Sequence, residues 1–363
     1  MGSKSNSPNE ISSRLVSEDD GVGAGQIRSS RLLVVYNPNL CHLHNGGGVE
    51  TGKRVEAVIN RLHSTFNENI FVVDEEEASE AQLLLAHSAF QIELFLTLSS
   101  PLKSGRGAHS RRLQVKELQD NIFSEGTKEA VLLAAHFGIH SLGLIFDQRR
   151  THRVFCVTRP PGHHAGYESM EGFCYFNNAA ITALYALDNY SNSVERVAVL
   201  DFDVHHGNGT EEILKEKMGC WYGSTYQENI YPVEGVPKYS KDVCSSNGCN
   251  RRLSKHCQSQ EFRVKWKQVV AAMIEFEPDL VIISAGFDAH RLDKMSNTRL
   301  VESDFGWATE CILQALLNMN PLRDTPVISL LEGGYNVKVL ESCVEAHCSA
   351  LAKEYYPTQD ISF

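Results

Sequence analysis

Two carboxylates and an imidazole alternate in the stretch Asp201-Phe202-Asp203-Val204-His205, which follows an apolar run and precedes a glycine-rich turn. Alternate residues of an extended strand share one face, so Asp203 and His205 can reach a common point at the strand end, with Asp201 behind them. This arrangement predicts a metal-binding or catalytic site. The structural alternative is a polar strand end that caps the next helix, and it requires only Thr210 as the N-cap residue.

Three more groups of reactive side chains follow apolar runs. They are His163 and His164 after residues 154–157, Asp288 after 280–284, and Glu332-Gly333-Gly334-Tyr335 after 327–331. Each group alone has a simpler explanation, because a histidine pair can be a satisfied hydrogen-bonding pair and a Gly-Gly-Tyr segment can be a turn. In open α/β sheets, however, sites form outside the carboxyl ends of the strands. Four groups in equivalent positions therefore predict one shared site.

Asp203, His205 and Asp288 together offer two carboxylates and one imidazole, which leaves positions on a bound cation open for water and substrate. Oxygen and nitrogen donors without a thiolate suit Zn²⁺, while ligand type alone leaves Fe²⁺ and Mn²⁺ open. The ten cysteines do not change this expectation. Apart from Cys174 they fall away from the strand ends, and small buried hydrophobic side chains are their expected role.

The elements that must position these residues alternate along the chain. Apolar runs predict strands at 31–36, 71–73, 154–157, 197–202, 220–225, 280–284 and 327–331. Helical spacing predicts helices at 49–63, 79–90, 124–146, 177–187, 211–217, 261–276, 305–319 and 337–355. We therefore expect an α/β fold, a single domain with a mostly parallel central β-sheet flanked by helices.

Three segments interrupt this alternation. Residues 1–28 are rich in Ser, Gly and acidic residues, so we expect a disordered tail, which leaves 29–363 as the catalytic domain. Residues 99–119 are polar and basic and predict a surface loop. Residues 236–260 show little periodicity and predict an irregular loop.

Composition limits the function classes. The 363-residue chain is 42% hydrophobic, enough for a large core, and its formal net charge of −11 argues against direct nucleic-acid binding. No apolar run approaches the roughly 20 residues that span a bilayer, so we expect no membrane association. Scattered cysteines and the lack of an apolar signal segment predict free thiols and an intracellular protein of the cytoplasm, the nucleus or both. The oligomeric state is not predicted.

Five long motifs, in order, resemble the zinc-dependent histone deacetylase family. They are Arg159-Pro160-Pro161-Gly162-His163-His164-Ala165, Gly172-Phe173-Cys174-Tyr175-Phe176-Asn177-Asn178, Asp201 to Thr210, Ser284-Ala285-Gly286-Phe287-Asp288-Ala289-His290 and Leu331-Glu332-Gly333-Gly334-Tyr335-Asn336. The Arg-Pro-Pro-Gly and Asp-Phe-Asp-Val forms are similar to the class II branch and its bacterial relatives. The resemblance covers about residues 31–350 and implies the arginase/deacetylase fold.

The resemblance also implies roles. Asp203, His205 and Asp288 would hold one Zn²⁺ per chain, and a structural monovalent cation near Asp201 is also implied. His163 and His164 would flank the attacking water, with His164 as general base and then acid. Tyr335 would donate its hydroxyl to the developing oxyanion.

Further residues would support or line this site. Asp201 would orient His163, and Asn208 would orient His164. A neutral amide stabilises an imidazolium less than a carboxylate does, so His164 should stay neutral to lower pH than in relatives with Asp at that position. The resemblance also implies substrate-binding residues, which would line the channel and its rim or hold the substrate backbone. They are Asp120, Gly172, Phe173, Tyr231 and Met295.

Some positions depart from the family pattern. Tyr226 stands in Ser224-Thr225-Tyr226-Gln227 where Ser-Leu-His-Gln is usual, Tyr231 replaces a phenylalanine wall, and loop 236–260 lacks the expected Asn-Leu-Pro-Leu type of segment. These changes affect the substrate preference rather than the metal ligands. Arg54 has two interpretations of equal weight, as part of an acetate exit path or as an exposed helix residue.

The leading hypothesis is a zinc amidohydrolase that removes acetyl groups from lysines of histones or other proteins, with a role in chromatin regulation. A second enzyme hypothesis keeps the same machinery for an acetylpolyamine or another small acetylated amine. An arginase-like binuclear manganese hydrolase needs more carboxylates than the segments around Asn208 and Asp288 supply. A binding scaffold without activity conflicts with intact His163, His164 and Tyr335.

Overall fold

The computed structural model describes residues 32–45, 48–100, 121–232 and 242–356. Within these ranges nine strands form one sheet in the order β2-β1-β3-β9-β8-β4-β5-β7-β6. They are β1 (Leu32–Tyr36), β2 (Phe71–Val73), β3 (Arg153–Cys156), β4 (Val197–Asp201), β5 (Cys220–Gln227), β6 (Val243–Ser245), β7 (Gly248–Leu253), β8 (Leu280–Ala285) and β9 (Val327–Leu331). All ladders are parallel except that of β6 with β7. The predicted single α/β domain with a mostly parallel sheet is confirmed. The predicted tail 1–28 lies outside the described residues.

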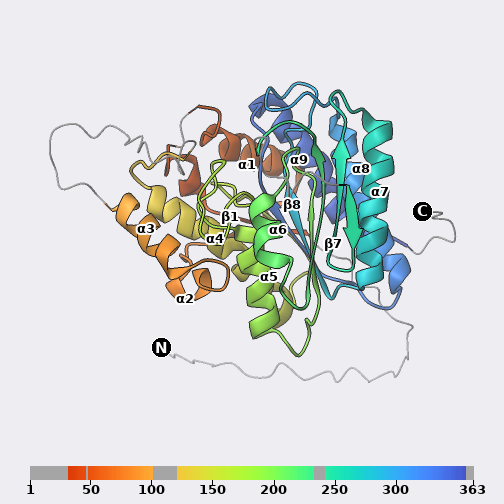
Figure 1. Cartoon of the computed structure of the whole chain (residues 1–363), viewed down its shortest axis with the longest axis horizontal. Helices are drawn as coiled ribbons and strands as arrows, with labels where there is room; N and C mark the ends of the chain where they lie inside the picture. Colours follow the sequence, from red (N-terminus) through yellow and green to blue (C-terminus); the bar gives the residue numbers. More distant parts are fainter. Residues whose placement is uncertain (1–31, 46–47, 101–120, 233–241, 357–363) are drawn as a thin grey trace, which may run out of the picture.

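Helices cover both faces of this sheet (Figure 1). They are α1 (Lys53–Thr65), α2 (Glu80–Leu83), α3 (Ala89–Ser99), α4 (Thr127–Leu142), α5 (Asn178–Asn189), α6 (Asn208–Leu214), α7 (Ser259–Phe276), α8 (Glu302–Met319) and α9 (Val337–Ala352). Neighbouring helices α1, α9, α8 and α7 pack in one layer, and α4, α5 and α6 pack in another. Because both faces are covered, the central strands are mostly apolar and are buried along their whole length.

The most apolar helical segment is explained by this packing. Residues Thr127–Asp147, which comprise α4 and a following π-helical turn, are long and apolar enough to cross a membrane by length and composition. In the fold, however, 78% of the most apolar window is buried inside the protein. The apolar composition therefore fits a core helix.

Two predictions of local structure are wrong. The helix predicted at 79–90 is divided into α2 and α3, because Ser88 caps α3 by accepting a hydrogen bond from the Gln91 amide. Buried His87 holds the break, since its ring bonds to the Gly166 carbonyl and to the Asn177 amide. The loop predicted at 236–260 contains the β6–β7 hairpin, and β7 extends the sheet by pairing with β5.

The hairpin also corrects the prediction of free thiols. Cys244 and Cys249 face each other across the β6–β7 pair with a Cα–Cα distance of 4.0 Å and form a disulfide. The other eight cysteines have free thiols, and most of them are buried, as expected for small hydrophobic side chains.

Strand register places the reactive residues at one edge. Asp201 at the end of β4 pairs with Ser284 of β8, and Ala285 pairs with Leu331 of β9. The residues that follow these strands, among them Asp203 and Asp288, consequently leave the sheet at the same edge.

A buried ion cluster braces the segments beneath this edge. Glu50 Oε1 accepts hydrogen bonds from Arg159 Nε at 2.9 Å and Arg54 Nη1 at 3.3 Å, and all three side chains are fully buried. Arg54 also donates to the backbone carbonyls of Gly334 and Glu332. The interpretation of Arg54 as an exposed helix residue is therefore wrong. Both guanidiniums hold the pKa of Glu50 below its usual value despite burial.

We predict that Glu50→Gln lowers the free energy of unfolding by about 3 kcal/mol, because it leaves two buried guanidiniums without their counter-charge. Urea denaturation followed by circular dichroism measures the change. Glu56→Gln on the exposed side of α1 is the matched control and should stay within about 0.5 kcal/mol of the wild type. Equal stability of the two variants would contradict the prediction.

Candidate active site

Asp203, His205 and Asp288 converge at the carboxyl edge of the sheet. His205 Nδ1 lies 3.0 Å from Asp203 Oδ1 and 3.1 Å from Asp288 Oδ2, and all three side chains are buried. One ligand atom from each residue lies within 4.8 Å of the other two, a spacing that can hold a metal ion. The structure thus brings together the three predicted ligands.

The surroundings of these carboxylates fit a cation. Asp288 Oδ2 is buried and accepts no hydrogen bond within the described residues, although His205 Nδ1 is 3.1 Å away. Gly333 lies directly against both carboxylates, since a Cβ at this position would be 2.3 Å from Asp288 Oδ2 and 2.4 Å from Asp203 Oδ2. Two buried carboxylate groups with one imidazole and little steric obstruction match an oxygen and nitrogen donor set for Zn²⁺.

Each histidine of the His163-His164 pair has its own partner. His163 Nδ1 lies 3.1 Å from Asp201 Oδ2, and His164 Nδ1 lies 2.7 Å from Asn208 Oδ1. The two ring centroids are 3.9 Å apart, and His163 Nε2 is 3.9 Å from Asp203 Oδ2. Both predicted pairs are therefore present, and Nε2 of His163 faces the cluster.

The surroundings of the two histidines shift their pKa values in opposite directions. Burial opposes protonation of His163, but the Asp203 and Asp201 carboxylates outweigh it and raise the pKa of His163 to about 10. Burial, together with His163 and His205, lowers the pKa of His164 well below its usual value. A dication held by Asp203 would act against the shift at His163. His164 is thus the neutral imidazole of the pair, which a general base must be.

Asp293, which belongs to none of the five motifs, holds the loop that carries Tyr335. Asp293 Oδ2 accepts hydrogen bonds from the backbone amides of Tyr335 at 2.6 Å and Asn336 at 2.9 Å. The Arg54 guanidinium lies 4.8 Å from the Tyr335 ring centroid. Burial, with Asp288 and Asp203 nearby, raises the pKa of Tyr335 well above its usual value. Its hydroxyl consequently stays a hydrogen-bond donor at neutral pH.

Aromatic rings surround the approach to the cluster. The ring centroid of Phe173 is 5.7 Å from that of Tyr335, and the Tyr231 ring is 4.7 Å from His164. Gly172 has a φ of +59°, and a Cβ there would lie 2.4 Å from His164 Cδ2, so the position requires glycine. Half-buried Met295 donates its amide to Asp293 Oδ1 and lies beside the Tyr335 loop. Asp120 lies outside the described residues.

Two acidic residues of the site were not assigned roles from the sequence. Glu332 accepts hydrogen bonds from the amides of Gly162 and His163, and burial raises its pKa to about 7. Glu171 accepts a 2.6 Å hydrogen bond from Asn208 Nδ2, which fixes the amide oxygen of Asn208 toward His164. Glu332 stood within a motif, whereas Glu171 carried no signal besides its position next to Gly172.

His206 is buried against neighbouring rings. Its centroid is 4.8 Å from that of Tyr226, and its Nε2 lies 3.1 Å from Glu211 Oε2. The tyrosine that departs from the family pattern at 226 is therefore a packing partner of the turn after β4.

Comparisons with known proteins agree with this geometry. Residues 48–351 match the family model of the histone deacetylase domain. The chain is 29% identical over 330 residues to a probable deacetylase of Methanothermobacter thermautotrophicus, covering 90% of this chain and 92% of that protein. It is 32% identical over 248 residues to histone deacetylase 6 of Caenorhabditis elegans, covering 65% of this chain but 25% of that protein. The crystal structure of the HDA15 HD domain matches with a TM-score of 0.74 and 25% identity, covering 89% of this chain and 90% of that one.

We predict that Gly333→Ala weakens Zn²⁺ binding at this cluster at least tenfold, because the added Cβ would push both carboxylates out of position. Calorimetric titration of metal-free protein measures the affinity, and the binding event at this cluster is the one that Asp203→Asn abolishes. Gly143→Ala, where the nearest atom would be 3.6 Å from the new Cβ, is the control. Unchanged affinity in Gly333→Ala would show that the loop adjusts freely.

Proposed function

The chain belongs to the histone deacetylase family and is a hydrolase of that family, and from this premise we propose that it is a zinc-dependent deacetylase of acetylated lysine side chains. The observation that carries the proposal is the buried Asp203–His205–Asp288 cluster with two partnered histidines beside it. Bound Zn²⁺ would polarise the amide carbonyl and acidify the attacking water.

The proton transfers fall to His164. As a neutral imidazole with Nδ1 bonded to Asn208, it takes the proton of the attacking water on Nε2 and later delivers it to the leaving amine nitrogen. His163, held in place by Asp201, would flank the attacking water beside His164. Tyr335 donates its hydroxyl to the oxyanion, an interaction that strengthens in the transition state.

The proposed substrate follows from the aromatic approach. Phe173, Tyr231 and the ring of Tyr335 present apolar faces that suit the methylene stem of a lysine, and Gly172, which has no Cβ, lets the backbone lie against the rings of His164 and Tyr231. Met295 would contact the substrate at the rim. Asp120, which we propose to hold the substrate backbone, lies outside the described residues.

A small acetylated amine such as an acetylpolyamine would use the same machinery. The phenol at Tyr231 favours this second candidate, because it adds a hydrogen-bonding group to a wall that is otherwise apolar. A binuclear centre of the arginase type lacks support, because within the described residues the only other candidate metal group shares no ligand with this cluster.

Three further proposals accompany this function. We propose that the catalytic domain spans 29–363, that a structural monovalent cation binds near Asp201, and that the protein works in the cytoplasm, the nucleus or both. The cation proposal is supported by the fixed position of the Asp201 carboxylate, which accepts hydrogen bonds from Tyr222 Oη and from the Asp203 amide.

A substrate panel tests the function. We expect hydrolysis of acetyl-lysine peptides by the zinc-loaded protein, inhibition by a hydroxamate, and a loss of kcat of about 10²-fold or more in Tyr335→Phe, which removes the oxyanion donor. Tyr355→Phe, three residues beyond the end of α9, is the control for loss of a phenol, because the Tyr355 hydroxyl bonds to the Ala350 carbonyl. Turnover of acetylpolyamines alone would select the second candidate, and hydroxamate binding without any turnover would indicate a scaffold.

The pH dependence tests the role of Asn208. Asn208→Asp should raise the pKa of His164, because a carboxylate stabilises the imidazolium better than a neutral amide does. Activity needs neutral His164 and is lost as pH falls through that pKa, so the acidic limb of kcat/KM should move to higher pH. Glu171→Gln, added to Asn208→Asp, removes the repulsion between adjacent carboxylates and should keep the shift.

Asn250→Asp is a matched control, since Asn250 likewise donates its amide to a glutamate, Glu211, at 2.8 Å but contacts no catalytic histidine. Its pH profile should equal that of the wild type. An acidic limb unchanged in both Asn208 variants would refute the assignment of His164 as the base.

A further inference from the structure

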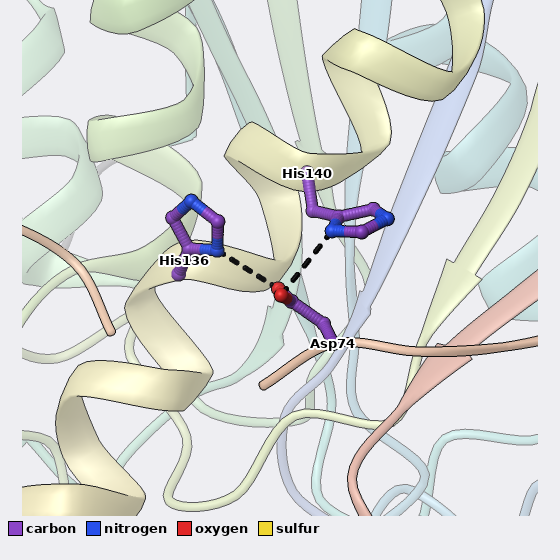
Figure 2. A group of neighbouring side chains, drawn as sticks. All are labelled: Asp74, His136 and His140. Atoms are coloured by element: carbon purple, nitrogen blue, oxygen red, sulfur yellow. Dashed lines mark hydrogen bonds and ion pairs between the residues drawn. The ribbon is translucent and has the colours of Figure 1, made fainter. Parts of the chain in front are cut away.

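A second group of metal-ligand side chains lies apart from the active site. Asp74 follows the edge strand β2, and His136 and His140 lie one helical turn apart on α4. Figure 2 shows both imidazoles pointing from the same side of the helix toward the carboxylate of Asp74. In the sheet order, β2 and β4 are five strand spacings apart, roughly 24 Å.

The distances resemble a coordination shell. His136 Nδ1 lies 2.9 Å from Asp74 Oδ2, and His140 Nδ1 lies 3.2 Å from Asp74 Oδ1. Ligand atoms about 2.0–2.1 Å from a tetrahedral Zn²⁺ are separated by about 3.3 Å. A small outward movement of the two rings would thus create the space for the ion.

The outer nitrogen of His136 also has the partner that a metal-bound imidazole usually has. Its Nε2 lies 3.6 Å from Glu76 Oε2, at ion-pair rather than hydrogen-bond distance. A carboxylate on the far nitrogen fixes the ring and makes the near nitrogen a better donor. Glu76 is exposed and can approach the ring.

The charge at this position calls for a cation. Asp74 is buried, yet within the described residues its ion-pair partners are the two histidines, without a lysine or arginine. Asp74-Glu75-Glu76-Glu77 adds three more acidic residues to the same loop. A proton on an imidazole or a bound cation can balance the buried carboxylate, and the contacts with His136 and His140 lower the pKa of Asp74 despite burial.

We propose that Asp74, His136 and His140 form a second metal site that binds Zn²⁺ or a similar divalent transition-metal ion. Two imidazoles and a carboxylate suit such ions better than Mg²⁺ or Ca²⁺. The half-exposed side of His140 leaves a coordination position for water. Bound metal would tie β2, which among the described strands pairs only with β1, to the core helix α4.

Metal content and the double variant His136→Gln/His140→Gln test this site. After removal of metal and reloading with Zn²⁺, we expect two ions per wild-type chain, one in the double variant and one in Asp203→Asn. The double variant should keep acetyl-lysine hydrolysis. His63→Gln, which alters another histidine paired with a carboxylate, Glu68, but without a third ligand, should keep two ions.

The outcomes separate this site from the catalytic one. One ion in the wild type that is lost in Asp203→Asn would overturn the second site and leave the proposed function standing. One ion that survives Asp203→Asn but is lost in the double variant would support the second site and remove the catalytic zinc. Two ions in the double variant would also overturn the proposal.

Thermal stability supplies a measurement that does not depend on activity. Excess Zn²⁺ should raise the Tm of Asp203→Asn by roughly 3 °C, since a ligand that binds only the folded chain stabilises it. Asp74→Asn, which keeps the size of the side chain, should reduce this rise when added to Asp203→Asn and serves if the double histidine variant does not fold. An equal rise with and without Asp74 would refute the proposal, and Mg²⁺ should produce none.

Discussion

Burial of negative charge at the carboxyl edge of the sheet is the constraint on which the site depends. Asp201, Asp203, Asp288 and Glu332 are each fully buried there. Isolated buried carboxylates are costly, so each must receive hydrogen bonds or a positive partner. Backbone amides supply part of this, as when Gly333 donates to Asp203 and Val204 donates to Asp288. Histidines supply more of it, a cation held by Asp203, His205 and Asp288 would add to it, and the sheet register holds these side chains close together.

The sequence predicts which side chains meet at this edge, because the signals that it uses are local. A carboxylate directly after an apolar strand is visible in one dimension, and parallel strands bring such positions to one edge. The partners that hold the site in place come from distant segments and carry no such signal. Arg54 is buried because Glu50 and the carbonyl of Gly334 accept its hydrogen bonds, and no property of its own helix indicates this. Asp293 and Glu171 are further examples, since each acts through a backbone or amide contact.

The missed hairpin has a related cause. Strand β7 reads Gly-Cys-Asn-Arg-Arg-Leu and lacks an apolar run, so periodicity gives no strand there. Pairing with β5 on one side and β6 on the other supplies the hydrogen bonds, and Cys249 and Leu253 supply the buried contacts. The break between α2 and α3 likewise depends on His87, whose partners lie about 80 to 90 residues farther along the chain.

The chain neutralises its buried carboxylates in two ways. One way only stabilises the fold, whereas the other also allows a metal ion to bind. Glu50 is paired with two guanidiniums, which carry a permanent charge, so its carboxylate is already neutralised and needs no metal ion. Asp203 and Asp288 are both paired with the imidazole of His205, and Asp74 is paired with the imidazoles of His136 and His140. Imidazole exchanges a proton for a metal ion at the same nitrogen, whereas a guanidinium cannot. A buried carboxylate whose positive partners are only imidazoles is therefore a place where a cation can enter without removing an existing ion pair, and the active site and the Asp74 cluster both satisfy this condition.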